Sequence, residues 1–557
     1  MNHIIADYII TPLANGTEAN LAAVASGRTE MKKHADRFPS VEPFCASVFD
    51  NVQNVNGFSK FESLCIEAVR YALSEKGLKI ADSTNTVFIV STTKGNVEFL
   101  TTGGDTSLIV SACKIAAYFN NPNAPLVVSN ACVSGVCALI TAMRLLEAQQ
   151  YINAVIVGCD VLSPFIVSGF QSLKALSANP CRPFDAQRDG LNLGEAAACV
   201  VMTADSCYSS LSLGSVMRGA IHNDANHISG PSRTGEGSLR CLQDMEVDPH
   251  DLAFVNVHGT ATAYNDEMES IALTRAGWQD VPVNALKAYF GHTLGAAGLV
   301  ETILSLHALR QGYVLGTKGY QEQGTTQRLN ICTEVTPTSK TEFVKLLSGF
   351  GGCNAAIKVA LQGKEQASNA THQSLKCMAE VRISPAGVTV NGKELHMSQQ
   401  GEKLLTEIYK THVNEYPKFY KMDTLSRLGF VATELLVQSL GEERFVDRED
   451  RAVVFANRSS SQKNDTDYQQ TIRPDEYFPS PSLFVYTLPN IVTGEIAIRN
   501  KYFGETSFYV LDSEKDLLPL AESALQQRNT TSVLAGWTEC TGPDQFDAHV
   551  MLLTNQE

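Results

Sequence analysis

Three kinds of pattern are missing from this chain of 557 residues. Its 14 cysteines include no Cys-x-x-Cys pair, which argues against zinc-ribbon and thioredoxin-like sites. No apolar run approaches the roughly 20 residues that a membrane-spanning helix needs. The first residues, MNHIIADYIITPLANG, lack the basic segment and apolar core of a signal peptide. We therefore expect a cytoplasmic protein whose cysteines are free thiols that mostly pack in the core.

Positive charge is also in short supply. The chain has 59 Asp and Glu residues against 44 Lys and Arg residues, a net charge of -15 at pH 7. This balance argues against non-specific nucleic-acid binding and does not suggest an anionic membrane as partner. The sequence contains no GxGxxG, Walker, HxxxH or HExxH pattern, so we expect neither a bound cofactor nor a metal ion.

What is present is an alternation of short apolar runs with helical stretches. The segment 136–150 (VCALITAMRLLEAQQ) predicts a helix, because its apolar residues recur every three to four positions. The continuous apolar runs between such helices are typical of a sheet that is buried on both faces, which indicates an α/β fold. The expected strands are 86–91, 124–130, 153–159, 253–259 and 355–362.

A polar segment without periodicity, 363–374 (GKEQASNATHQS), is interpreted as a linker between domains at 1–362 and 375–557. The second domain weakly echoes the first. The echoes indicate either a partial duplication of one half-fold or chance similarity between α/β segments. They pair 450–462 with 85–96, 497–513 with 115–132, and 533–539 with 155–161.

One cysteine stands between an apolar strand and a run of small residues, in VVSNACVSGVC (127–137). A helix is expected to start near 133–135, so Cys132 would lie at a helix N-terminus, where the macrodipole and free N–H groups lower a thiol pKa. The small neighbours leave room for a substrate carbonyl, as in a nucleophile elbow with cysteine in place of serine. Taken alone, such a cysteine is better explained as a buried packing residue.

Two histidines follow, each at a strand end rich in glycine and threonine. His258 lies in VNVHGTATAYNDEME and His292 lies in KAYFGHTLGAAG. Lys287 precedes His292 by five residues in largely apolar surroundings. A semi-buried lysine there would hold both histidines neutral by charge repulsion. Neutral imidazoles can donate N–H hydrogen bonds to a developing oxyanion.

Together these motifs resemble the β-ketoacyl-[acyl carrier protein] synthases, the condensing enzymes of fatty-acid and polyketide assembly. The resemblance covers about 1–362 and implies a five-layered αβαβα thiolase-like fold, usually as a homodimer. The chain departs from the family at GEAAA (194–198) and at Cys353, which bears on substrate preference more than on chemistry. The matching motifs are NACVSG (130–135), GFQSLKALSANPCRPFDAQRDGLNLGEAAA (169–198), HGTAT…ND…E (258–269), KAYFGHTLGAAG (287–298) and LSGFGGCNAA (347–356).

The resemblance implies a mechanism. Cys132 would take an acyl chain from the phosphopantetheine thioester of an acyl carrier protein, and malonyl-carrier protein would then lose CO₂ and attack the acyl-cysteine. His258 and His292 would stabilise the enolate, while the backbone N–H groups of Cys132 and Phe350 would bind the tetrahedral oxyanion. The implied catalytic residues are Cys132, His258, His292, Lys287 and its carboxylate partner Glu301, and the implied substrate, oxyanion and gating residues are Phe350, Gly351, Gly352, Thr260 and Thr262.

The resemblance also implies which partners the protein has. The pantetheine arm arrives on the acyl carrier protein, so the enzyme needs no cofactor of its own, and further condensing-enzyme subunits are additional candidates. An acidic carrier protein needs a local basic patch, for which Lys32, Lys33 and Arg37 are candidates.

The second domain resembles a synthase N-terminal half without its catalytic motifs. Its segment 478–504 is similar to small synthase-like proteins that accompany condensing enzymes in bacterial aryl-polyene and flexirubin clusters. We expect it to be structural or to dock a partner. Two other functions stay open for the chain: a non-catalytic chain-length factor, and a thiolase-like or chalcone-synthase-like enzyme that uses CoA thioesters.

Overall fold

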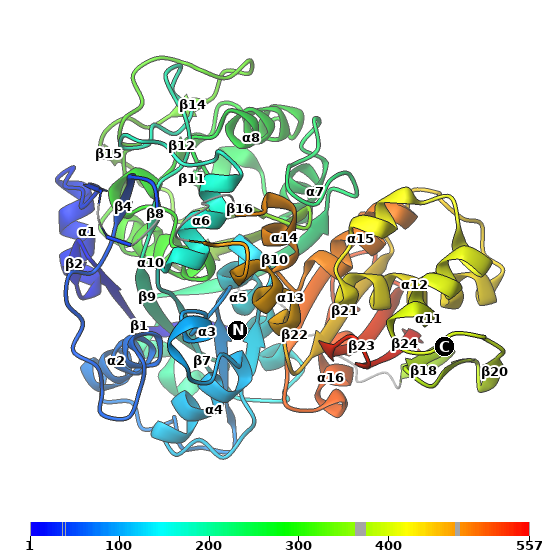
Figure 1. Cartoon of the computed structure of the whole chain (residues 1–557). Coiled ribbons are helices and arrows are strands. Elements are labelled where there is room, and N and C mark those ends of the chain that lie inside the picture. Colours follow the sequence, from blue (N-terminus) through cyan, green and yellow to red (C-terminus); the bar gives the residue numbers. More distant parts are fainter. Residues whose placement is uncertain (1, 36, 39–40, 363–374, 474–478, 556–557) are drawn as a thin grey trace.

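The computed structural model describes residues 2–35, 37–38, 41–362, 375–473 and 479–555. The expected linker at 363–374 lies outside the described residues. Figure 1 shows the C-terminal part, in yellow to red, packed beside the blue and cyan part of the chain. Among the residues that the structure describes, no helix has both the length and the apolar character to cross a membrane.

The N-terminal part contains two half-sheets that share one strand contact. β1 joins them, because it pairs with β9 on one side and through His3 and Ser215 with β10. The first half-sheet has the order β6 (Leu126–Val128), β5 (Thr86–Ser91), β7 (Asn153–Asp160), β9 (Ala196–Thr203) and β1 (His3–Thr11). The second has the order β10 (Gly214–Asn223), β17 (Cys353–Ala360), β16 (Glu342–Gly349), β11 (Leu252–Asn256), β12 (Pro282–Asn284) and β14 (Asn330–Ile331).

Helices form three layers around the two half-sheets. The middle layer is α5 (Ser134–Glu147) and α10 (Ala297–Arg310), which contact strands of both half-sheets. Both helices are buried along almost their whole length, which explains why they are apolar on every side. α2 (Lys60–Glu75) and α4 (Leu108–Tyr118) form one outer layer, and α7 (Glu236–Asp244) with α8 (Ala263–Arg275) forms the other. The five-layered αβαβα fold is therefore confirmed.

Local sequence signals fix several of these helices. Ser59 and Glu62 form a reciprocal capping box that starts α2. Asp423 accepts a hydrogen bond from the Ser426 N–H at the start of α12 (Thr424–Leu440), and Gly441 ends that helix in the left-handed conformation. The remaining short elements are β2 (Ala14–Asn15), α1 (Thr17–Ala25), β3 (Lys32–His34), β4 (Phe44–Ser47), α3 (Phe99–Thr102), α6 (Pro164–Ser172), β8 (Leu193–Gly194), α9 (Lys287–Phe290), β13 (Tyr313–Val314) and β15 (Thr336–Pro337).

The C-terminal part carries a smaller sheet of the same kind. α12 and α15 cover one face of the sheet, and α16 covers the other and reaches α5. The main strands have the order β18 (Leu375–Ser384), β24 (Gln545–Asn555), β23 (Ser532–Gly542), β21 (Arg451–Asn457) and β22 (Thr506–Val510), with β19 (Gly387–Val390) and β20 (Lys393–Leu395) beyond β18. The helices are α11 (Glu402–Ile408), α12, α13 (Gln462–Gln469), α14 (Pro481–Tyr486), α15 (Ile491–Asn500) and α16 (Leu517–Ala524).

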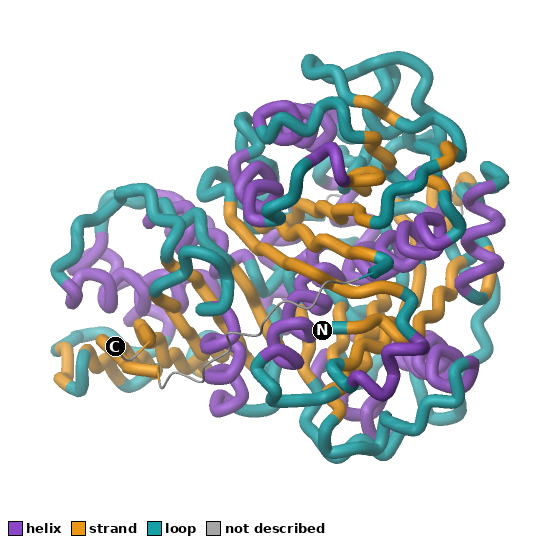
Figure 2. Tube along the Cα trace, turned by 180° about the vertical axis from the view of Figure 1, so that it is seen from behind, coloured by secondary structure: helices purple, strands orange, loops and turns teal. Residues whose placement is uncertain are grey.

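The two parts join edge to edge through β6 and β22. These strands pair antiparallel, with Val128 opposite Tyr509 and Val127 opposite Val510. In the N-terminal part β5 pairs in parallel with β6 and β7, and in the C-terminal part β21 pairs in parallel with β22 and β23. The three sequence echoes fall on these corresponding strands, so equivalent edges of two similar half-folds meet. Figure 2 shows the resulting continuous row of strands from behind.

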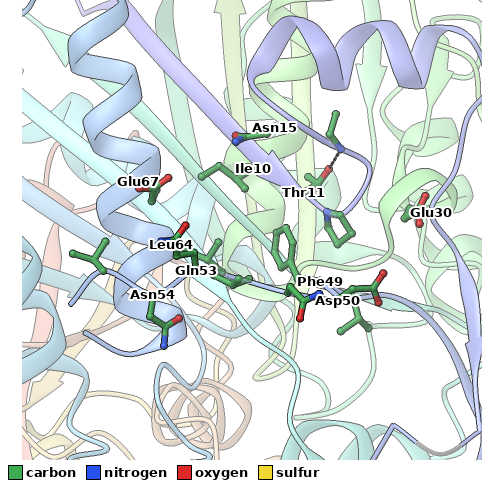
Figure 3. Close-up of a pocket in the computed structure, with 16 residues that line it drawn as sticks. Ile10, Thr11, Asn15, Glu30, Phe49, Asp50, Gln53, Asn54, Leu64 and Glu67 are labelled. Carbon is green, nitrogen blue, oxygen red and sulfur yellow. Dashed lines mark hydrogen bonds between the residues drawn. The ribbon is translucent and has the colours of Figure 1, made fainter. Parts of the chain in front are cut away.

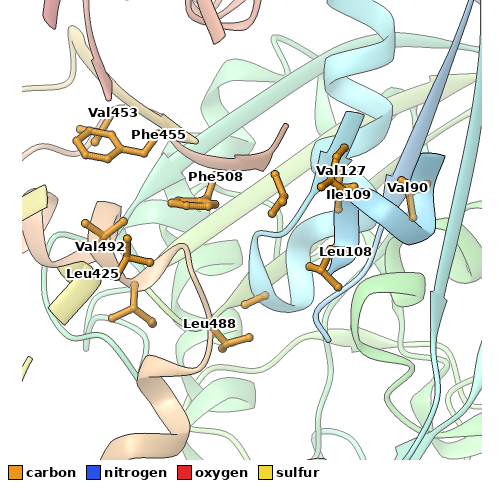
Figure 4. Packing of buried hydrophobic residues seen from close by; sticks show 14 of the residues in the cluster. Val90, Leu108, Ile109, Val127, Leu425, Val453, Phe455, Leu488, Val492 and Phe508 are labelled. Carbon is orange, nitrogen blue, oxygen red and sulfur yellow. The ribbon is translucent and has the colours of Figure 1, made fainter. Parts of the chain in front are cut away.

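The junction is packed as a protein interior. One hydrophobic cluster contains Val127 and Leu108 from the N-terminal part together with Phe508, Val492 and Leu488 from the C-terminal part (Figure 4). Two ion pairs also cross it: a buried pair of Arg144 with Glu505 at 2.8 Å, and a pair of the buried Lys94 with the partly buried Asp465 at 2.7 Å. Burial of this kind couples the two parts into one folded body.

The expected strands and helix are found with small shifts at their ends. β5 has the expected bounds 86–91, β11 ends at Asn256, three residues before the expected end, and α5 begins at Ser134. All cysteines among the described residues are free thiols, and most are buried, as expected.

Candidate active site

Cys132 lies in a one-turn helix, Ala131–Val133, between β6 and α5. The preceding residue Ala131 has a left-handed backbone with φ 49°, an unusual conformation for alanine that is typical of functional turns. Ser134 closes this turn, because its Oγ accepts from the Asn130 N–H at 2.8 Å and donates to the Ala131 carbonyl at 2.6 Å. The strand-turn-helix placement of Cys132 is as the sequence predicts.

The structure brings both predicted histidines to Cys132. His258 follows β11, and His292 follows α9. Their ring centroids are 5.1 Å apart at an interplanar angle of 84°. The Cys132 sulfur and one nitrogen of each histidine lie within 4.8 Å of one another. The same three atoms are of types that can hold a metal ion, and they are the one such group found among the described residues.

One hydrogen bond indicates which ring nitrogen of His292 carries the proton. The Leu294 N–H donates to His292 Nδ1 at 3.3 Å, so Nδ1 is the acceptor and the ring proton is on Nε2. Nε2 is buried and has no hydrogen-bond partner among the described residues. A buried donor without a partner is available to a substrate oxygen. His258 likewise has a buried Nδ1 without such a partner.

A buried charge cluster lies behind the two histidines. Lys287 Nζ donates to the His258 carbonyl at 2.6 Å and to Glu301 Oε1 at 2.7 Å, so the predicted pairing of Lys287 with Glu301 is present. Lys345 on β16 binds the other oxygen of Glu301 and donates to the Val257 carbonyl at 3.2 Å. Burial lowers the pKa of Lys345 to about 8. Our sequence reasoning missed Lys345, although a lysine inside the apolar run EFVKLLSG is a signal in itself.

The histidines are neutral because of this environment. Burial lowers the pKa of both His258 and His292 well below the usual 6.5, and the positive charges of Lys287 and Lys345 lower it further. The sequence argument from Lys287 therefore has the right direction, but desolvation is the larger cause.

The Glu269 carboxylate orients His258 by accepting hydrogen bonds from the backbone of His258 and Gly259. Glu269 Oε1 accepts from the His258 N–H at 2.7 Å, and Oε2 accepts from the Gly259 N–H at 2.8 Å. Glu269 is the last residue of the HGTAT…ND…E motif, and sequence reasoning gave it no role. Thr260 Oγ1 and Thr262 Oγ1 are 3.0 Å apart on the same turn.

The expected low pKa of Cys132 is wrong. The side chain is only 9% exposed, and burial raises the pKa of its thiol to about 12, against the opposing effect of the Lys287 charge. The helix N-terminus that we expected to favour the thiolate is itself inside the protein, where desolvation of a negative charge outweighs the dipole. With this pKa, Cys132 is a thiol rather than a thiolate at neutral pH.

A cavity of about 800 Å³ opens onto these three side chains. Phe350, Thr260 and Thr262 line it, as predicted. Gly351 and Gly352 are not among its lining residues. They have positive φ angles and hold the loop in place, because the Gly351 N–H donates to the Ile228 carbonyl and the Asp224 N–H donates to the Gly352 carbonyl.

Basic residues stand at the cavity. Lys174, Arg188 and Arg233 line it. Lys32, Lys33 and Arg37 do not, and Lys32 and Arg37 form ion pairs with Glu30 and Asp50. A second cavity of about 780 Å³, near β1 and α2, is lined by polar residues such as Asn15, Gln53 and Asn54 and by none of the predicted site residues (Figure 3).

Comparisons with known proteins show the family of this chain. The family models described as "Beta-ketoacyl synthase, N-terminal domain" and "Beta-ketoacyl synthase, C-terminal domain" match residues 4–206 and 213–321. Nodulation protein E of Rhizobium leguminosarum bv. trifolii is 30% identical over 41% of this chain and 60% of its own length, so the chain spans about three fifths of that relative. The 3-oxoacyl-[acyl-carrier-protein] synthase 2 of Coxiella burnetii is 25% identical over 63% of this chain and 95% of its own length.

One solved structure matches the entire chain in fold. It is a protein described as "PfaC Keto synthase-Chain length factor", with a TM-score of 0.80, 12% sequence identity, and coverage of 100% of this chain and 78% of that chain. The match includes residues 375–557, so the side-by-side arrangement of the two parts has a counterpart in a known structure.

Proposed function

Because the chain belongs to the β-ketoacyl synthase family, we propose that it is a 3-oxoacyl-[acyl carrier protein] synthase of fatty-acid or polyketide assembly. It would lengthen a Cys132-bound acyl chain by decarboxylative Claisen condensation with malonyl-carrier protein. The observation that carries this proposal is the convergence of one thiol and two neutral imidazoles at the base of one cavity.

The first half-reaction is acyl transfer. The Cys132 sulfur attacks the carbonyl carbon of the acyl-pantetheine thioester, a new C–S bond forms, and the pantetheine sulfur leaves. Because the resting Cys132 is a thiol, its proton must leave the sulfur during attack, and the departing pantetheine sulfur takes up a proton to leave as a thiol. The backbone N–H groups of Cys132 and Phe350 would bind the oxyanion of the tetrahedral intermediate.

The second half-reaction is condensation. The malonyl thioester loses CO₂, and the electron pair of the broken C–C bond is delocalised as an enolate. His292 Nε2–H and the N–H of His258 would donate to the enolate oxygen, and a neutral ring supplies the one N–H that each of these hydrogen bonds needs. The enolate carbon then attacks the acyl-cysteine, and Cys132 leaves as thiolate. Lys287, with Glu301 as its partner, acts here through the histidines, because it binds the His258 carbonyl and lowers both pKa values.

We propose that residues 1–362 form the synthase unit and residues 375–557 a non-catalytic half-unit that takes the place of a partner subunit. The edge of β6 is already paired with β22, so a homodimer of this chain would need a different surface. This arrangement supports a chain that carries its own partner half.

The acyl carrier protein is the expected partner, and it would deliver the phosphopantetheine arm to the cavity. Lys174, Arg188 and Arg233 line that cavity beside Asp189 and Asp224, and these three cationic side chains are the groups that would contact an acidic carrier or the phosphate of its arm.

The proposal is tested by supplying acyl-carrier protein and malonyl-carrier protein and measuring CO₂ release and the 3-oxoacyl product. We expect both with the wild-type protein. His292→Ala should still transfer the acyl group to Cys132 but lose CO₂ release. Equal loss of both steps in His292→Ala, with the fold intact, would contradict the assigned division of labour.

A further inference from the structure

The loop that carries Phe350, residues 349–352, is here called the gate loop, and it is held from both parts of the chain. From its own part, the Gly351 N–H donates to the Ile228 carbonyl and Asn223 Nδ2 donates to the Gly351 carbonyl at 2.8 Å. From the C-terminal part, Asn490 Nδ2 donates to the Phe350 carbonyl at 2.8 Å. Asn490 directly precedes α15. The C-terminal half-unit therefore binds the backbone of Phe350, which lines the cavity beside Cys132.

The contact is close enough to require glycine on both sides. A Cβ at Gly494 on α15 would lie 2.5 Å from the Gly351 carbonyl oxygen, and a Cβ at Gly351 would lie 2.6 Å from Asn490 Nδ2. Gly351 also has φ +91°, which side-chain-bearing residues rarely adopt. The gate loop and the start of α15 therefore meet backbone to backbone.

The Phe350 ring is supported from the same direction. It stacks on Phe170 with ring centroids 6.3 Å apart, and Phe170 packs edge-to-face against Phe484 on α14 at 5.5 Å. The carbonyl and the ring of Phe350 are thus both backed by the C-terminal part, one directly and one through Phe170.

Asn490 is poorly explained as a folding residue. It is buried, and its Oδ1 has no hydrogen-bond partner among the described residues. A buried amide oxygen without a partner lowers stability, so an apolar residue would suit the fold better. What an asparagine supplies at this position is the Nδ2 donor, which binds the Phe350 carbonyl.

We propose that Asn490 is a positioning residue by which the C-terminal half-unit holds the Phe350 gate closed beside Cys132. This inference rests on the proposed function, because a gate matters only where a substrate must reach the thiol. Opening of the loop breaks the hydrogen bond from Asn490 Nδ2 to the Phe350 carbonyl, so the half-unit sets how often Cys132 is accessible.

The test compares Asn490→Ala with Asn457→Ala, a control within the C-terminal part whose Nδ2 likewise donates to a main-chain carbonyl, that of Ser460, at 2.8 Å. Two readouts are used: hydrogen–deuterium exchange of the peptide that contains 349–352, and the rate of Cys132 alkylation by iodoacetamide, followed by peptide mass. Loss of one hydrogen bond should raise both roughly fivefold in Asn490→Ala. Asn457→Ala should leave both unchanged even where it lowers the thermal midpoint.

A double mutant separates gating from general loosening. In a Phe350→Ala background the ring is absent, so Asn490→Ala should no longer change the alkylation rate. Unchanged exchange and alkylation in Asn490→Ala, or an equal increase with Phe350→Ala already present, would overturn the inference. Neither readout needs turnover, so failure of the wild-type protein to accept an acyl group would count against the proposed function and not against the Asn490 contact.

Discussion

Lys287 Nζ lies 2.7 Å from Glu301 Oε1 and 2.6 Å from the His258 carbonyl oxygen, and all three residues are buried. One ammonium group thus joins a carboxylate to the backbone of a predicted catalytic histidine. Its charge adds to desolvation in keeping both histidine rings neutral. The protonation state of the site is therefore fixed by groups behind it rather than by the solvent in the cavity.

The first prediction concerns pH. A lowered histidine pKa means that the rings stay neutral as the pH falls past 6.5 and become protonated only well below it. Titration of these two rings should therefore leave the rate of decarboxylation unchanged between about pH 8 and 6.5 and lower it only at more acidic pH. In Lys287→Met one cause of the shift is gone, so the acid-side fall should begin at a higher pH. Lys345 still pairs with Glu301 in this variant, which keeps the carboxylate compensated.

The measurement is CO₂ release from malonyl-carrier protein across about pH 5 to 8 for both proteins. Lys287→Arg is the matched control, since it keeps the charge. An acid limb at the same pH in Lys287→Met as in the wild type would show that the lysine charge does not act on the histidines.

The second prediction concerns the enolate donor. His292→Ala removes the Nε2 donor, and loss of one such donor typically costs about 10² to 10³ in rate. We expect that loss in the decarboxylation step and a much smaller change in the alkylation of Cys132. Stopped assays of CO₂ release beside mass analysis of the alkylated peptide give both values. A decarboxylation rate within about threefold of the wild type would remove His292 from the proposed role.

The third prediction concerns Cys132 itself. Because burial raises the pKa of its thiol to about 12, the thiolate fraction should grow about tenfold per pH unit throughout the ordinary working range. The rate of iodoacetamide alkylation at Cys132 should therefore rise without a plateau from about pH 7 to pH 9.5. A plateau near pH 7 would show a stabilised thiolate and would restore the expectation drawn from the helix N-terminus.

The fourth prediction concerns the junction of the two parts. Lys94 and Asp465 form an ion pair across it in which Lys94 is buried and Asp465 is partly buried, and Lys94 also donates to Ser461 Oγ at 3.0 Å. Removing one charge of a buried pair leaves the other uncompensated and costs about 3–5 kcal/mol. Lys94→Met should therefore destabilise strongly, and the double variant Lys94→Met with Asp465→Leu should recover much of the loss. Urea unfolding of the wild type, both single variants and the double variant measures the coupling; additive losses would mean that the pair is not coupled.

Short-range sequence patterns predicted most of the fold and the three side chains that meet at the cavity. The apolar runs predicted β5, β6, β7, β11 and β17, because buried strands of a covered sheet have little freedom in composition. The two histidine motifs and Cys132 were recognisable since each places its side chain at the end of its own strand or helix. Their meeting in one cavity follows from the αβαβα fold, which brings strand ends together.

What the sequence could not predict were contacts between distant segments. Asn490 stands in LPNIV, with no local feature that points to Phe350, and 140 residues separate the two. The antiparallel pairing of β6 with β22 is equally invisible to local patterns, although the echo between the two strands was present. The raised pKa of Cys132 was missed because desolvation depends on the whole surrounding protein, whereas the helix dipole can be inferred from the adjacent residues.

The central claim, that Cys132 is the acyl-accepting nucleophile of a condensing enzyme, is tested most directly by intact-protein mass after a single turnover. The protein is incubated with a panel of acyl-carrier proteins of different chain lengths, without malonyl-carrier protein, and Cys132→Ala serves as the control. We predict a mass increase of one acyl group on the wild-type protein and none on Cys132→Ala, with the preferred chain revealing the donor. An acyl adduct that persists in Cys132→Ala, or no adduct from any donor, would contradict the account.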